Sequence, residues 1–211
     1  SGAALGWTVP TSGTSPAGYE YEVRTSGAAG SGATGLVASG STTAPTVSAS
    51  LTGLNGGTAY TFYVRSDCGG GDLSIWTSAT FTTLCDVINS FPYTENFDGV
   101  TAPSLPNCWS FIDANNDGDK WITYSGYSQS GNNSVGLYTD YNYGDNNDFL
   151  ISPQFNLSGI KRLKYSVRAR SSSEPNDYRV LLSTTGTSAS DFSTVLLPLT
   201  SKWRSIQFSV I

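Results

Sequence analysis

The sequence contains no histidine among its 211 residues, and this absence excludes several kinds of catalytic site. Without an imidazole the chain cannot carry Ser-His-Asp or Cys-His catalysis, and it cannot bind zinc through histidine. No pair of nucleophile and base stands out elsewhere, although hydrolysis by paired carboxylates stays formally open. We therefore expect a protein that is not an enzyme.

Charged residues are also scarce. Asp, Glu, Lys and Arg make up 13% of the chain, and the net charge is −5. This charged fraction is about half the typical share. An acidic chain without a basic, aromatic-lined groove is not expected to bind nucleic acid. No apolar run is long enough to cross a membrane, so we expect no membrane insertion, while the oligomeric state stays open.

The chain has few cysteines, Cys68, Cys85 and Cys108, and it lacks methionine. No Cys-x-x-Cys pair is present, which argues against a structural zinc site or a thioredoxin-type site. In this Gly/Ser/Thr-rich acidic chain we expect one disulfide and one remaining thiol in an oxidising, extracellular setting. Because the sequence opens with Ser-Gly and stops within an expected strand, we interpret it as an internal fragment of a longer secreted protein.

Glycine, serine, threonine and asparagine take the place of the missing charges. These residues form poor helices and good turns, so an all-β fold is expected. Short alternating strands cover residues 1–84, residues 85–90 read as a linker, and about seven further strands with long connections cover 91–211. The Gly/Ser/Ala run at 26–40 is predicted to be a mobile hairpin tip.

The spacing from Leu54 through Tyr60 to Val64 resembles the tyrosine corner of fibronectin type III domains, where a Tyr hydroxyl reaches back to the backbone before its strand. Trp7 stands where that family buries its core Trp. The resemblance implies a sandwich whose first strand is missing before Ser1, and it implies a spacer or binding arm.

The same resemblance bears on the disulfide. The strand ends that carry Cys68 and Cys85 lie near each other in such a sandwich, so we prefer a Cys68–Cys85 bridge. A Cys85–Cys108 bridge, which would tie the linker to the next domain, is the alternative, and sequence alone does not decide the connectivity.

An acidic loop at 113–119, directly before Lys120 and Trp121, is the most informative stretch of the chain. So many carboxylates repel one another unless a cation lies among them, and Ca²⁺ takes six to eight hard oxygen ligands. The loop matches an EF-hand at positions 1, 3, 5, 6 and 7, but Tyr124 stands where position 12 requires Glu, so it is not an EF-hand. The alternative is a surface turn rich in Asp and Asn without a metal.

Several ordered motifs surround this loop, at residues 95–99, 106–109, 112–121, 148–157, 174–186 and 189–192. Together they resemble the cleaved-adhesin domains, the jelly-roll hemagglutinin and adhesin modules of gingipain-type proteins, which are similar to MAM domains. The resemblance covers 91–211 and implies a jelly-roll β-sandwich that lacks its last strands here. It also implies calcium bound by the loop and its flanking motifs, and the candidate ligands are Asp98, Asp113, Asn115, Asp117, Asp119 and Asp148.

Two surfaces are candidates for ligand recognition. The loop at 138–148 carries Tyr138, Tyr141 and Tyr143, whose rings suit a glycan, although they can instead fold back onto the sandwich. Basic residues alternate with apolar ones at 162–170, so that Arg168 and Arg170 would share a strand face that could grip acidic sugars. A solvated strand face balanced by nearby acids is the alternative.

Together these expectations describe a secreted or cell-surface adhesion region of a Bacteroidetes-type protein. It would be calcium-stabilised and would bind glycans or surface proteins. Two alternatives remain, an accessory region of a secreted protease or other hydrolase whose catalytic domain lies outside the sequence, and a purely structural stalk.

Overall fold

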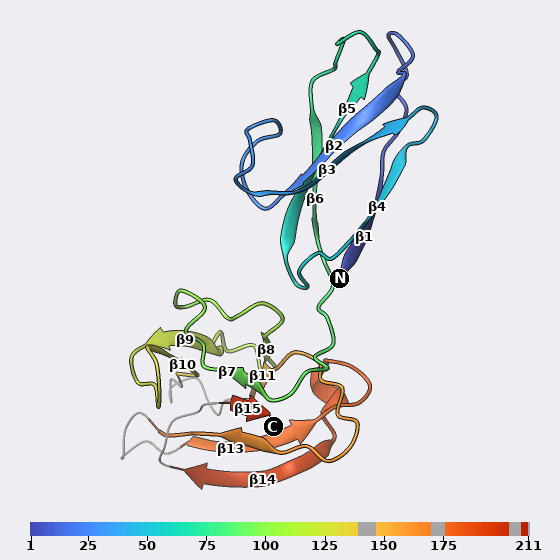
Figure 1. Cartoon of the computed structure of the whole chain (residues 1–211). Coiled ribbons are helices and arrows are strands. Elements are labelled where there is room, and N and C mark those ends of the chain that lie inside the picture. The colour runs from blue at the N-terminus through green and yellow to red at the C-terminus, as the bar shows by residue number, and fades with distance from the viewer. Residues whose placement is uncertain (139–146, 170–175, 203–207, 211) are drawn as a thin grey trace. The chain divides into compact units, whose positions relative to one another are not determined.

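The computed structural model describes residues 1–138, 147–169, 176–202 and 208–210 of the chain (Figure 1). It divides into two compact units, Ser1–Asp86 and Val87–Ile211. The boundary falls within the stretch assigned above to a linker. The described residues form antiparallel strands and one short 3-10 helix, without any α-helix, so the all-β prediction is confirmed.

Two antiparallel sheets form the first unit. The smaller sheet pairs β1 (Gly2–Gly6) with β4 (Ser48–Thr52). The larger sheet has four strands, in the order β3 (Leu36–Thr43), β2 (Gly18–Arg24), β5 (Ala59–Asp67) and β6 (Thr77–Thr82).

Most of the core of this unit comes from alternate strand residues, as the period of a strand requires, and Leu54 adds to it from the connection between β4 and β5. Its buried members are Leu5, Val23, Leu54, Tyr60 and Phe62. Beside them, the Trp7 ring packs with its centroid 5.9 Å from that of Phe62. The Tyr60 hydroxyl accepts a hydrogen bond from the Asn55 backbone N–H at 3.0 Å, which is the contact that the tyrosine-corner spacing predicts.

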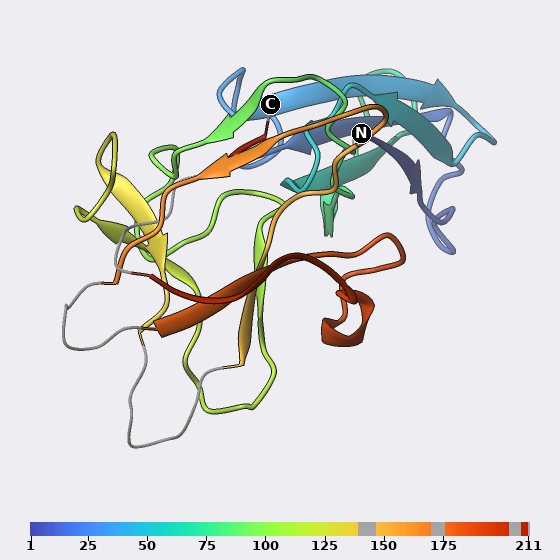
Figure 2. The same ribbon diagram turned by 90° about the horizontal axis from the view of Figure 1, so that it is seen from below.

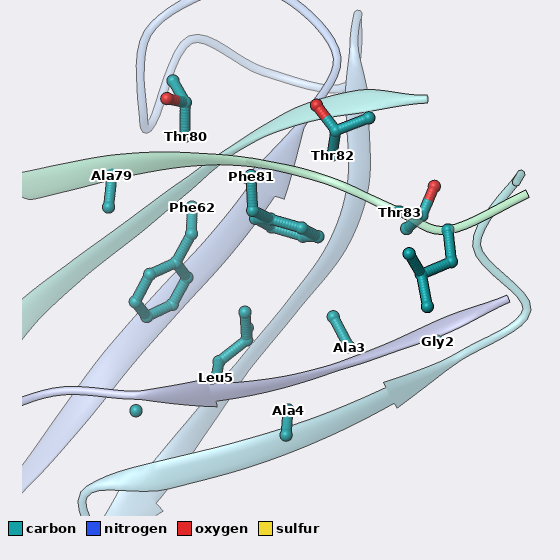
Figure 3. Close-up of a pocket in the computed structure, with 12 residues that line it drawn as sticks. Gly2, Ala3, Ala4, Leu5, Phe62, Ala79, Thr80, Phe81, Thr82 and Thr83 are labelled. Atoms are coloured by element: carbon teal, nitrogen blue, oxygen red, sulfur yellow. The ribbon is translucent and has the colours of Figure 1, made fainter. Parts of the chain in front are cut away.

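A groove of about 380 Å³ opens between β1 and β6 (Figure 3). Leu5, Phe62 and Phe81 point into it from three different strands. In the described part of the chain β1 pairs with β4 alone, so its other edge offers unpaired backbone groups beside this groove. Such an edge is where a further strand could extend a sheet.

Arg24 organises the loop that the sequence predicted to be a mobile tip. Its side chain is fully buried, and its guanidinium lies 2.6 Å from the Glu22 carboxylate. It also donates hydrogen bonds to the backbone carbonyls of Ser26, Gly32 and Thr34 and to the Ser31 hydroxyl. The run does form the tip of a hairpin between β2 and β3, but the predicted extent of 26–40 is too long, because residues 36–40 belong to β3 and pair with β2.

In the second unit β12, β15 and β7 form a three-stranded sheet, and the remaining strands pair two by two. Figures 1 and 2 show β13 and β14 as a long hairpin, with the 3-10 helix η1 in the connection between them. The elements are β7 (Tyr93–Glu95), β8 (Ser110–Asp113), β9 (Ile122–Ser125), β10 (Asn133–Gly136), β11 (Asp148–Ile151), β12 (Leu163–Tyr165), β13 (Asn176–Leu182), η1 (Ala189–Asp191), β14 (Thr194–Lys202) and β15 (Phe208–Val210).

Phe97, Trp109 and Val135 form the buried core of this unit. The Phe97 and Trp109 rings meet edge to face with their centroids 5.1 Å apart, an arrangement that aromatic quadrupoles favour. The alternation at 162–170 predicted a strand that carries Arg168, but β12 spans only Leu163–Tyr165, so Arg168 does not lie on it. Among the described residues, no helix is both long and apolar enough to cross a bilayer.

The preferred disulfide is wrong. Cys68 is a free cysteine, whereas Cys85 and Cys108 are both disulfide-bonded, as the alternative pairing has them. Cys68 lies in a tight turn after β5, where its N–H donates to the Asp72 carbonyl at 2.9 Å and its thiol faces the Thr14 carbonyl at 3.9 Å. The thiol therefore points toward the loop before β2.

Because Arg24 is buried and fully partnered, we expect Arg24→Ala to lower the free energy of unfolding of the first unit by about 3–5 kcal/mol. Urea denaturation of the whole chain, followed by amide NMR signals of residues 1–86, measures this loss. Arg65→Ala is the matched control, since Arg65 pairs with Glu20 at 2.6 Å but is 25% exposed. Its loss should be about 1 kcal/mol or less. Equal losses for the two variants would contradict the role of Arg24.

Candidate metal centre

Strand pairing brings together three carboxylates that are distant in sequence. β8 pairs with β11 in a register that places Asp113 opposite Asp148, and Asp117 lies in the loop directly after β8. One ligand oxygen from each of the three lies within 4.8 Å of those of the other two. We call Asp113, Asp117 and Asp148 the acidic triad.

The loop after β8 folds back on its own backbone. The Asp113 carboxylate accepts hydrogen bonds from the N–H groups of Asp117 at 3.2 Å and Gly118 at 3.0 Å. In turn Asp117 accepts from the Asp119 N–H at 2.8 Å and from the Asn115 side-chain amide at 2.7 Å. Gly118 has a φ of +91°, a conformation that glycine adopts without steric cost. These hydrogen bonds fix the positions of the Asp113 and Asp117 carboxylates.

Asp148 is the member of the triad that lacks compensation. Both its carboxylate oxygens are buried, and neither accepts a hydrogen bond from a described residue. Burial, together with the negative charges of Asp117, Asp113 and Asp119, raises the pKa of Asp148 to about 6. A buried polar group without a partner is costly, and an anion more so. A bound cation would supply the missing partner and offset the repulsion.

The donor set fits a hard divalent cation. All three triad members offer carboxylate oxygens, and the chain has no histidine to favour a softer metal. Asp119 lies close enough to raise the pKa of Asp148, and Asn115 is held against Asp117. These two residues, which the sequence also proposed as ligands, therefore border the triad.

Asp98, also a predicted ligand, has hydrogen-bond partners of its own away from the triad. Its carboxylate accepts hydrogen bonds from the backbone N–H groups of Asn132 at 2.7 Å and Asn133 at 2.8 Å, and from the Asn96 side chain at 2.9 Å. It therefore fixes the turn before β10, and it is not a member of the acidic triad. The sequence motif around Asp98 marked an important acid without revealing this role.

Of the residues predicted to bind a ligand, Tyr141, Tyr143 and Arg170 lie outside the described residues. Tyr138 is 61% exposed. Arg168 is exposed too, and its guanidinium carbon lies 5.4 Å from the centre of the Tyr127 ring. This cation–π pair, which sequence spacing did not indicate, links the end of the basic run to the loop before β10.

Comparison with known proteins identifies the second unit. Residues 93–209 match the family model described as Cleaved Adhesin Domain. The chain belongs to the cleaved adhesin family. The matched region is an adhesin domain, not a catalytic one, and it contains the acidic triad.

The relatives are far longer proteins of Porphyromonas gingivalis. The chain is 33% identical to Hemagglutinin A over 116 residues, which is 49% of this chain and 5% of that protein. It is 31% identical to Lys-gingipain and to Gingipain R1 over 110 residues, which is 49% of this chain and 6% of each. The chain thus matches only a small part of each relative. No solved structure matches.

The unpartnered state of Asp148 leads to a prediction for the metal-free protein. In the presence of EDTA at pH 8, Asp148→Asn should raise the melting temperature by a few degrees, because it removes a buried charge and its repulsion. The gain in melting temperature should shrink as the pH falls through about 6. The wild-type Asp148 carboxylate then binds a proton, and its buried negative charge no longer destabilises the folded state. Differential scanning calorimetry measures both effects, and a lower melting temperature at pH 8 would contradict the assignment.

Proposed function

We propose that this chain is a calcium-stabilised adhesion region of a secreted or cell-surface protein, and that it binds glycans or surface proteins. The observation that carries the proposal is the acidic triad within a cleaved adhesin domain. The names of the relatives, hemagglutinin and gingipain, support an adhesive role for the matched region. The bonded cysteines, Cys85 and Cys108, fit an oxidising, extracellular location.

Calcium is the cation that this donor set suits best. Asp113, Asp117 and Asp148 would hold it, with Asn115 and Asp119 as further oxygen donors beside them. Calcium accepts many oxygen ligands in flexible geometry, and extracellular sites function with weak affinity because the ion is abundant there. Bound calcium would tie the loop after β8 to β11 and neutralise part of the local negative charge.

We also propose a domain arrangement. Residues 1–84 form a fibronectin type III-like sandwich, 85–90 a linker, and 91–211 a jelly roll. The two antiparallel sheets of the first unit and the Tyr60–Asn55 hydrogen bond support the first assignment. The antiparallel strand pairs of the second unit and its family membership support the other. The first unit would then act as a spacer or binding arm.

A second candidate function is that of an accessory region that targets a secreted protease to its substrate. The presence of Lys-gingipain and Gingipain R1 among the relatives favours it. As an adhesin or as an accessory region, this region binds and does not catalyse. The two functions would differ in whether a protease domain belongs to the same protein. A purely structural stalk would instead bind calcium and nothing else.

Calcium should stabilise the folded protein, because it binds the assembled triad far better than the unfolded chain. The stabilisation grows with the logarithm of the calcium concentration and is about 2.7 kcal/mol at a hundredfold excess over the dissociation constant. A thermal melt of the second unit across a calcium titration, beginning in EDTA, measures the shift. The double variant Asp113→Ala, Asp117→Ala should lose it.

Asp98→Asn provides the matched control for that titration. It weakens the contacts to the turn before β10, so it should lower the melting temperature in EDTA while keeping the calcium-dependent shift. Loss of the shift in this variant would place Asp98 among the metal ligands and overturn the assignment above.

Adhesion itself is tested by binding the whole chain to glycan arrays and to immobilised extracellular proteins, with calcium and with EDTA. We expect binding in calcium and reduced binding in EDTA. A protein that shows the calcium-dependent thermal shift but binds neither surface would support the stalk and contradict the adhesive function.

A further inference from the structure

A shallow groove of about 410 Å³ adjoins the acidic triad in the second unit. Three segments form it: the turn at 103–105, the beginning of β8, and the residues that lead into β9. Phe111 lies on one side with its side chain prominent, since the residue is 41% exposed. None of the residues predicted from sequence to bind a ligand lines this groove.

The polar groups of the groove are available for a ligand. The Lys120 ammonium lies 6.0 Å from the centre of the Phe111 ring, and no carboxylate among the described residues pairs with it. The hydroxyls of Ser104 and Ser110 also line the groove, and neither forms a hydrogen bond within the described part of the chain. An aromatic ring, two hydroxyls and one unpaired cation thus share a single surface.

We propose that this groove binds an acidic saccharide, a sugar ring that carries a carboxylate. The apolar C–H face of the sugar would pack on Phe111, as such faces do on exposed aromatic rings. The Lys120 ammonium would pair with the carboxylate, and the serine hydroxyls would bond to ring hydroxyls. The unpaired positive charge is what selects an acidic sugar over a neutral one. The inference rests on the proposed adhesive function and names its ligand class and site.

The groove is attached to the metal centre at several points. The Trp121 indole N–H, on the groove wall, donates to the Asp148 backbone carbonyl at 3.2 Å. Phe111 precedes the triad member Asp113 on β8, and Lys120 follows the acidic loop directly. A cation at the triad would therefore fix both walls and reduce the negative potential that an acidic sugar meets. Sugar binding should be calcium-dependent although the sugar does not contact the metal.

The test uses two probes that differ in one group, methyl β-glucuronide with a carboxylate and methyl β-glucoside with a hydroxymethyl group. Saturation-transfer NMR titrations of the whole chain in calcium should show weak binding of the glucuronide. The glucoside should bind about tenfold more weakly, as expected for the loss of one charge-assisted contact. Removal of calcium should weaken the binding of both probes.

Three variants locate the site. Lys120→Gln should make the two probes bind equally, and Phe111→Ala should weaken both. Lys161→Gln is the matched control, because its ammonium also lies over an aromatic ring, 5.0 Å from the centre of Phe91, outside the groove. It should leave both affinities unchanged. The calcium-dependent thermal shift, measured on each variant, shows that the fold and the metal site are intact.

The outcomes separate this inference from the proposed function. If the whole chain adheres to glycans in calcium but neither probe binds, or if Lys120→Gln leaves the preference for the glucuronide unchanged, the groove is not the site and adhesion stands. If the thermal shift is absent from the wild-type chain, the proposed calcium site fails whatever the sugars do.

Discussion

The crowding of carboxylates around Asp148 is the interaction that decides what the acidic triad can do. The pairing of β8 with β11 forces this carboxylate beside Asp113, and the loop after β8 adds Asp117. Burial removes the water that would otherwise solvate the charge, and the described protein provides no hydrogen bond in its place. The strand pairing and an ionised Asp148 therefore oppose each other unless a cation is bound.

Two other charged side chains, Arg24 and Asp98, have their charges compensated by hydrogen-bond partners. Arg24 is buried among backbone carbonyls and the Glu22 carboxylate, and Asp98 accepts backbone N–H groups of the turn before β10. Each of them organises a loop that has too few apolar side chains to pack on its own. Asp148 occupies a comparable position but lacks the partners. This contrast separates a candidate metal site from a structural anchor in a chain with many polar loops.

Sequence patterns predicted the parts of the fold that depend on local alternation and composition. β2 and β5 follow from the alternation around Tyr21 and Phe62, and the acidic loop follows from its density of oxygen ligands. β3 was not predicted, because the Gly/Ser/Ala run at 26–40 extends into it and hides where the strand begins, and its residues are ordered by pairing with β2. The predicted Cys68–Cys85 disulfide was wrong for a similar reason. Whether Cys68 can reach another cysteine depends on the turn after β5, which directs its thiol toward the Thr14 carbonyl.

For the candidate site, composition identified the carboxylates of the loop, and family resemblance added Asp148. Neither could separate Asp148 from Asp98, because both lie in acidic motifs and only the tertiary contacts differ. The groove beside the triad could not be predicted from the sequence, for another reason. Lys120 and Phe111 are unremarkable in sequence, and they become a candidate site only when the turn at 103–105 is placed beside them.

The arrangement also explains how a shallow surface could bind selectively. A groove this open excludes little water, so a single contact within it is weak and its geometry must be fixed in advance. Leu105, Trp109 and Trp121 already anchor one side of the groove in the hydrophobic core. A cation at the acidic triad would add order through β8 and through the Trp121 hydrogen bond to Asp148. A sugar that binds there would not need to organise the walls itself. Calcium would therefore support sugar binding indirectly, by keeping the walls of the groove in their binding conformation. Its loss would weaken binding without removing any atom that touches the ligand.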